Sequence, residues 1–240
     1  NTAVGRYALF ANSTASNNTA VGYNALYANT TGADNTAVGY LCLEDNTTGY
    51  HNTAIGAHCF VTNTTGYRNC AMGRSALYLN TTGHSNTALG NEALESNTTG
   101  IRNTAVGRYS LELNSTGTSN VGVGVSALAA NTTSSNNTAV GYEALGANTA
   151  ADNSAFGRYA LYSNTSGSPN CAFGYNALYA NTTGNQNVAM GAYANDAGNV
   201  SGTVAIGYAA LSANTGNSNT AVGASALLVN TTGVNNVAVG

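Results

Sequence analysis

Residues 18–32 read NTAVGYNALYANTTG, and close variants of this string return along the whole chain of 240 residues. The NTAVG-type strings begin at Asn1, Asn18, Asn35 and Asn52 and continue at a nearly constant spacing to a final NVAVG at Asn236. Numbered from its first Asn, the unit is N-T-A-V-G-x-x-A-L-x-x-N-T-T-G-x-x. A pattern sustained this long predicts a repeat architecture in which each unit is stabilised by its neighbours.

The length of the unit selects the architecture. Helical repeats need about 33 residues or more, because two helices are built in each unit. The unit of this chain, about 17 residues, suffices only for one coil of a β-solenoid. We therefore predict an all-β fold, a parallel β-roll of about 14 coils that forms one continuous array over residues 1–240. The chain starts in mid-pattern without Met, and we expect it to be a fragment of a longer chain.

Within the unit, T-A-V occupies positions 2 to 4 and is a short β-type run, so the side chains at positions 2 and 4 share one face. We expect the Val side to face the core, together with the Leu of the A-L segment, which is either a strand or a single helical turn. Asn at positions 1 and 12 is expected to form side-chain ladders between stacked coils. Gly at positions 5 and 15 is expected at a corner and at a return turn.

The rhythm breaks near residues 187–202, which read NVAMGAYANDAGNVSG. Asn195 stands there where other units have Leu, and the unit is one residue short. We predict a loosened core layer or a bulge at this coil, and no active site.

Composition excludes several classes of protein. Charged residues are 6% of the chain, all six basic residues are Arg, and the net charge is -3, which excludes the basic footprint of nucleic-acid binding. No apolar run approaches the roughly 18 residues of a membrane-spanning helix. No signal peptide is visible.

Catalytic and metal-binding patterns are also missing. The three His occupy different positions of their repeats, and no HExxH or Ser/His/Asp set emerges. Four Asp in the whole chain are too few for a calcium ladder. We predict no catalytic, cofactor-binding or metal-binding residues, and therefore no enzyme.

The N-[ST]-[AV]-[VI]-G element followed by A-L and a Gly turn resembles the head repeats of YadA-like trimeric autotransporter adhesins. Residues 18–32 resemble the repeat regions of phage and large-virus tail-fibre proteins still more closely. The resemblance covers nearly all of the chain. It implies a β-roll, frequent trimerisation, and a role as a fibre shaft or adhesive head. The unit of this chain is longer than that of the adhesin repeats.

Cys42 and Cys59 both occupy position 8, normally Ala, in adjacent units. Stacking would place their Cα atoms about 4.8 Å apart, within the range of a disulfide. An inter-coil disulfide is one hypothesis, and two small buried thiols in place of Ala are the other.

The N-T-T segment is also an acceptor sequon for N-glycosylation. One sequon per coil would permit a glycan-coated fibril, whereas the alternative is that Asn and Thr simply build the turn and its ladder. The candidate sites are Asn29, Asn46, Asn63, Asn80, Asn97, Asn131 and Asn181.

Tyr gathers at positions 6, 7 and 10 of the unit, and stacking would align these rings in a stripe for packing, a subunit interface or contact with surface glycans. We predict a structural extracellular, cell-surface or virion fibre that self-associates as a homotrimer or end to end. The alternatives are a carbohydrate-binding adhesin, testable on a glycan array, and an ice-binding β-solenoid, testable by thermal hysteresis.

Overall fold

The computed structural model describes residues 1–240, and every coil contains one short strand joined by turns, with no helix. The prediction of an all-β solenoid is confirmed, and equivalent residues such as Asn29 and Asn46 lie 17 positions apart in the chain. The strands are β1 (Thr2–Val4), β2 (Thr19–Val21), β3 (Thr36–Val38), β4 (Thr53–Ile55), β5 (Cys70–Met72), β6 (Thr87–Leu89), β7 (Thr104–Val106), β8 (Val121–Val123), β9 (Thr138–Val140), β10 (Ser154–Phe156), β11 (Asn170–Phe173), β12 (Asn187–Met190), β13 (Val204–Ile206), β14 (Thr220–Val222) and β15 (Val237–Val239).

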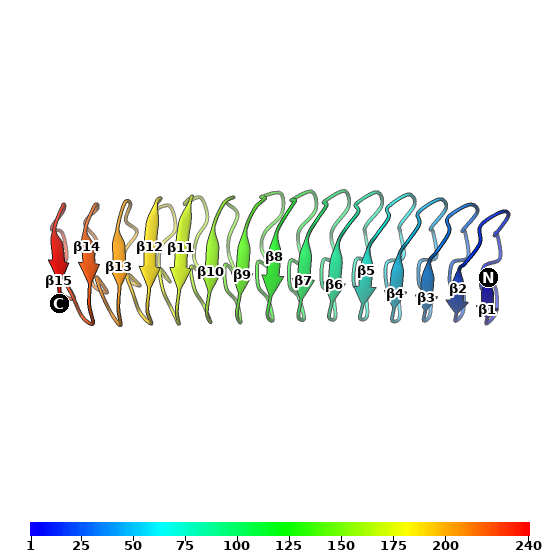
Figure 1. Ribbon diagram of the computed structural model, residues 1–240, viewed down its shortest axis with the longest axis horizontal. Helices are drawn as coiled ribbons and strands as arrows, with labels where there is room; N and C mark the ends of the chain where they lie inside the picture. Colours follow the sequence, from blue (N-terminus) through cyan, green and yellow to red (C-terminus); the bar gives the residue numbers. More distant parts are fainter. The chain divides into compact units, whose positions relative to one another are not determined.

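The contacts within the chain form two compact units, residues 1–120 and 121–240. In the first unit β1 to β7 pair in parallel in sequence order, and in the second unit β8 to β15 do the same (Figure 1). The register places like residues side by side, as in Thr36 beside Thr53 and Ala37 beside Ala54. Each repeat position therefore lies over its counterpart in the next coil, as predicted.

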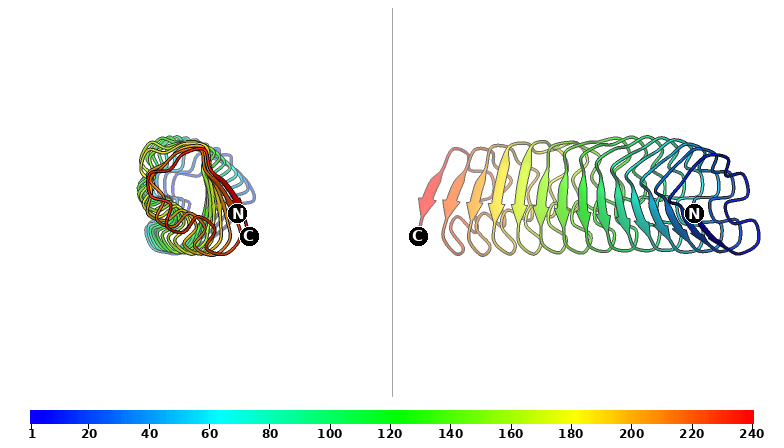
Figure 2. Two further views of the ribbon diagram at one scale, coloured as in Figure 1. Left: turned by 90° about the vertical axis from the view of Figure 1, so that its left-hand side faces the viewer. Right: turned by 45° about the vertical axis from the view of Figure 1, so that its right-hand side comes forward.

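The strand points Ala into the coil, so the prediction that Val faces the core is wrong. Ala37 is fully buried, whereas Thr36 and Val38 on either side are only half-buried. The opposite wall is the Leu row, in which Leu26 and Leu43 are fully buried, as predicted. Seen along the stack, each coil is a closed, irregular ring of backbone (Figure 2, left). Leu facing Ala fills this narrow interior, and a Val facing Leu would overpack it.

The A-L segment is neither a strand nor a helical turn. Its residues at positions 7 and 9 have left-handed backbones, with φ of 54° at both Asn24 and Leu26. The N–H groups at these two positions point in opposite directions: that of Asn24 donates to the carbonyl of Arg6 in the preceding coil, and that of Leu26 donates to the carbonyl of Cys42 in the following one. A left-handed Leu costs about 1–2 kcal/mol, and burial of its side chain, worth about 1.5–3 kcal/mol, offsets that cost.

Two ladders of buried Asn connect the coils, as predicted. At position 12, Asn46 Nδ2 donates to Asn29 Oδ1 at 2.8 Å and to the carbonyl of Gly49 at 3.0 Å. At position 1, the backbone N–H of Asn52 donates to Asn35 Oδ1 at 2.9 Å. Because each amide serves a neighbouring coil, the polar groups of the interior are satisfied only in the stack.

The Gly at position 5 is required both by its backbone and by close approach. Gly39 has φ of 141°, and a Cβ added there would collide with the carbonyl of Gly56 in the next coil. A Cβ added to Gly49 at position 15 would likewise collide with Asn46 Oδ1 and with the carbonyl of Gly66. These contacts explain why both positions are Gly in most units.

The short coil of residues 187–202 keeps the sheet intact. Its strand β12 stays in parallel register with β11 and β13, so no bulge occurs in the sheet. The change lies in the core layer, where Asn195 is fully buried and donates to Thr203 Oγ1 at 2.8 Å. Thr203 replaces the Asn of position 1 and donates in turn to Asn187 Oδ1 at 2.7 Å.

Candidate functional surface

The outer sheet face is formed by the side chains at positions 2 and 4 of each unit, and it contains no charged residue. Large apolar side chains are exposed on it: Met72 is 47% exposed and Met190 is 44% exposed. From β2 to β7 of the first unit, the face consists of Thr19, Val21, Thr36, Val38, Thr53, Ile55, Cys70, Met72, Thr87, Leu89, Thr104 and Val106. The sequence analysis missed this surface, because it assigned the Val row to the core.

The outer sheet face of the second unit is more apolar. Val121, Val188, Val204 and Val237 occupy position 2, where the first unit has mainly Thr. Phe156 and Phe173 at position 4 stack with ring centroids 4.5 Å apart and an interplanar angle of 7°. Contiguous exposed apolar surface of this kind marks a site of contact with another molecule.

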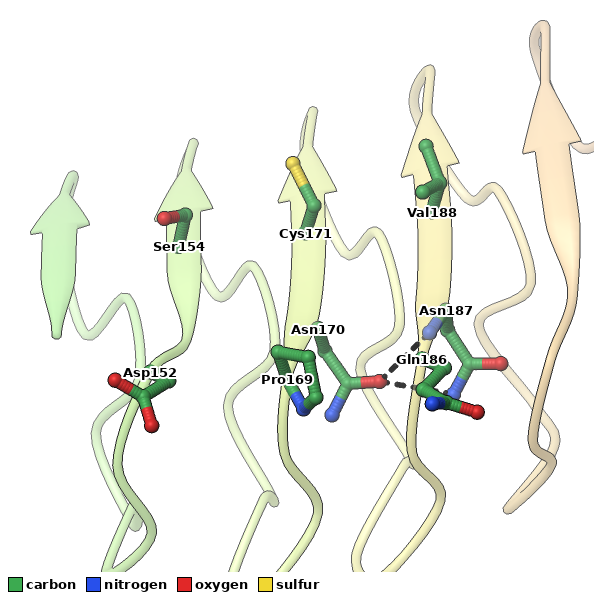
Figure 3. Close-up of a pocket in the computed structure, with 8 residues that line it drawn as sticks. All are labelled: Asp152, Ser154, Pro169, Asn170, Cys171, Gln186, Asn187 and Val188. Carbon is green, nitrogen blue, oxygen red and sulfur yellow. Dashed lines mark hydrogen bonds between the residues drawn. The ribbon is translucent and has the colours of Figure 1, made fainter. Parts of the chain in front are cut away.

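A depression of about 340 Å³ lies along one margin of this face, at the N-terminal ends of β10, β11 and β12 (Figure 3). Asp152, Pro169 and Gln186 line its lower rim, one from each coil, and Ser154, Cys171 and Val188 lie along the strands. Asn170 Oδ1 accepts two hydrogen bonds from Asn187 beside it. Its amide is thus committed to the ladder, and Asp152 is the one charged group of the lining.

Aromatic rings form a second surface feature, the aromatic row, at positions 6, 7 and 10. In the first unit Tyr23 stacks on Tyr40 with centroids 5.5 Å apart. In the second unit successive ring contacts of 5.2–6.1 Å join two groups of side chains. These groups are Tyr142, Tyr159, Tyr162 and Tyr179, and Tyr175, Tyr193 and Tyr208. The predicted alignment of rings between coils is therefore present.

Arg at position 6 pairs with rings more often than with carboxylates. The guanidinium carbon of Arg6 lies 4.7 Å from the ring centroid of Tyr7, and that of Arg108 lies 4.3 Å from that of Tyr109. Arg74 alone forms an ion pair, with Glu92 at 3.3 Å. Glu92 occupies position 7 of the following coil.

Three carboxylates, those of Glu92, Glu95 and Glu112, have oxygens within 4.8 Å of one another. Partial burial, followed by the charge of Glu92, raises the pKa of both Glu95 and Glu112, and the charge of Glu112 raises that of Glu95 further. The repeat pattern does not predict this cluster, because stacking aligns each position with its own counterpart in the next coil. Glu92 at position 7 instead approaches Glu95 and Glu112, which are both at position 10.

Cys42 and Cys59 lie in adjacent coils and are both fully buried free thiols. A hydrogen bond to Cys59, together with burial, raises the pKa of Cys42 far above its ordinary value. Cys42 also donates to the carbonyl of Ala54 at 3.1 Å. The two predicted partners are therefore side by side. Cys70 and Cys171 are only half-buried.

The Asn side chains of the candidate glycosylation sites are all buried: Asn29, Asn46, Asn63, Asn80, Asn97, Asn131 and Asn181 are 0% exposed. Asn63 illustrates their state, since its Nδ2 donates both to Asn46 Oδ1 and to the carbonyl of Gly66. An amide with both hydrogens engaged in the interior has no room for a sugar. The folded structure favours the ladder role of these residues over N-glycosylation.

A search with protein-family models finds no match to this chain, and a search of the curated proteins finds none with significant similarity. The structure has no helix with the length and hydrophobicity needed to span a membrane.

Proposed function

We propose that the chain is a non-catalytic segment of an extracellular or virion fibre, assembled from parallel copies through the outer sheet face. The single observation that carries this proposal is the uncharged outer sheet face with exposed Met72, Phe173 and Met190. An apolar sheet face left open in water favours association with a surface of the same kind.

The repeated geometry suits a partner with the same repeat. Like residues recur at each coil, so a second copy running parallel meets the same side chains at every level. Lateral packing of this kind fits a homotrimer better than end-to-end growth, because the apolar surface runs along the strands' outer side.

The bulk of the exposed side chains favours a protein partner over ice. A lattice of ordered water requires a flat surface of uniform side chains, and the row at position 4 changes from Val38 to Met72 and to Phe173. Side chains of unequal size interdigitate readily with another protein surface.

Sedimentation of the purified chain tests the proposal. We expect wild-type protein to sediment as a multimer, and the variant Ile55→Lys with Leu89→Lys to sediment as a single chain with an unchanged circular dichroism spectrum. Thr48→Lys is the matched control, because Thr48 is exposed outside the outer sheet face, and it should leave the multimer intact.

A wild-type chain that remains single at high concentration overturns the proposal. Thermal hysteresis shown by such a single chain would instead support the ice-binding alternative.

A further inference from the structure

Arg158 is the only basic side chain among residues 121–240, which contain no Lys and no His. It is exposed and lies within the aromatic row of the second unit. Its guanidinium carbon is 4.8 Å from the ring centroid of Tyr159, 5.5 Å from that of Tyr142 and 5.9 Å from that of Tyr175. These three rings come from three successive coils.

The charge of Arg158 has no acidic partner. The ion pairs of the structure are those of Arg74 with Glu92 and of His51 with Asp34, both in the first unit. A guanidinium offers five N–H donors. Arg158 is exposed, so these donors are open to solvent.

We propose that Arg158 and its flanking Tyr bind an acidic saccharide, with the guanidinium paired to a sugar carboxylate. A planar guanidinium and a carboxylate form two parallel hydrogen bonds. The electron-rich faces of Tyr142 and Tyr175 pack against the C–H groups of the adjoining sugar rings, and their hydroxyls hydrogen-bond to sugar hydroxyls.

The repeat extends this site along the chain. Successive coils are about 4.8 Å apart, and the row continues through Tyr193 to Tyr208, which is 60% exposed. A linear polysaccharide lying along the coils therefore meets aromatic surface on each successive coil. A compact anion such as phosphate would use Arg158 alone and gain nothing from the rings.

The site is separate from the outer sheet face, since it uses positions 6 and 7 instead of positions 2 and 4. It remains available when copies associate through that face. Glu143 borders the site, because it directly follows Tyr142 in the chain. Its negative charge opposes an acidic ligand.

Calorimetric titration of the full chain tests the proposal with three probes. Short oligogalacturonate supplies sugar and carboxylate, its methyl ester supplies the same sugar without charge, and polyglutamate supplies carboxylate without sugar. We expect only oligogalacturonate to bind.

The variants divide the site from the rest of the surface. Arg158→Gln should weaken oligogalacturonate binding at least about tenfold, Tyr175→Ala should also weaken it, and Glu143→Gln should strengthen it. Arg108→Gln is the matched control, because Arg108 contacts a single ring, and it should bind as the wild type does.

Equal binding of the methyl ester or of polyglutamate overturns the proposal, as does an equal loss in Arg108→Gln or no binding at millimolar oligogalacturonate. A circular dichroism spectrum that matches the wild type would show that Arg158→Gln is folded, so that its weaker binding reflects the missing guanidinium.

Discussion

A regular coil and the short coil of residues 187–202 solve the same packing problem with different side chains. In the regular coil of residues 35–51, Leu43 fills the core and Asn46 continues the ladder at position 12. In the short coil Asn195 takes the Leu place and Gly198 takes the ladder place.

The exchange leaves polar atoms without partners. Asn181 Oδ1 has no hydrogen bond, because Gly198 above it carries no amide, and Asn195 Oδ1 has none either. Asn199 repairs the adjoining turn, since its Oδ1 accepts the backbone N–H groups of Thr182, Thr183 and Gly184. The parallel backbone pairing is preserved through the short coil, and the side chains adjust to it.

The largest expected effect is at the corner Gly of a regular coil, compared with a turn Gly of the short coil. Gly39→Ala should lower the free energy of unfolding by about 4 kcal/mol or more, because its Cβ meets the backbone of the next coil. Gly202→Ala is the control in the short coil, where φ is 68° and the space is open. It should cost about 1 kcal/mol. Urea unfolding measures both, and equal losses would contradict the close-approach explanation.

The next largest loss of stability should come from interrupting the Asn ladder at position 12 of the regular coils. Asn63→Leu removes the hydrogen bonds to Asn46 and Gly66, and it should cost about 3 kcal/mol. Urea unfolding beside the wild type measures this loss. A near-neutral result would show that the ladder is incidental to stability.

The cysteine pair tests whether a regular coil also holds a covalent link. Alkylation of the native protein should label Cys70 and Cys171 only, because Cys42 and Cys59 are buried. If Cys42 and Cys59 formed a disulfide, the denatured protein would still carry two labels until reductant is added. Such a disulfide would stabilise the chain by about 3 kcal/mol. We expect four labels after denaturation without reductant, because both thiols are free in the structure. The double variant to Ala, the common residue of position 8, provides the reference.

In the short coil we expect a substitution that raises the free energy of unfolding. Asn195→Leu restores the common core residue between Leu178 and Leu211 and removes an unpartnered buried oxygen. We expect a gain of about 1–2 kcal/mol, from apolar burial and from the lost desolvation penalty. A loss in urea unfolding would mean that the bond from Asn195 to Thr203 outweighs the apolar contact.

The smallest effect concerns charge in the regular coils. Glu95 holds its proton more strongly in the folded chain than in the unfolded one, because burial and then Glu92 and Glu112 raise its pKa. Its contribution to stability is therefore present below its ordinary pKa and lost as pH rises through the folded value. Glu95→Gln should add a few tenths of a kcal/mol at pH 7 and nothing at pH 3. An equal gain at both values would point to packing instead.

The repeat predicted the stacking, both Asn ladders, the Leu row and the two Gly positions, because each depends on identity between coils. It did not predict which side of T-A-V faces inward, since Val and Ala are both apolar and the width of the coil decides between them. It also missed the left-handed backbone at Leu26, because sequence propensity disfavours that conformation and only burial and hydrogen bonds between coils stabilise it.

The pairing of each residue with its own counterpart has a consequence for how such a gene changes. Because the upper and lower edges of a coil match, as in Thr19 beside Thr36 and Thr36 beside Thr53, excision of one whole coil brings two complementary edges together. The number of coils is then free to drift by unequal recombination, whereas the loss of a single residue survives only in a turn, as in the coil of residues 187–202. The number of coils can therefore change without a change in the fold of any one coil.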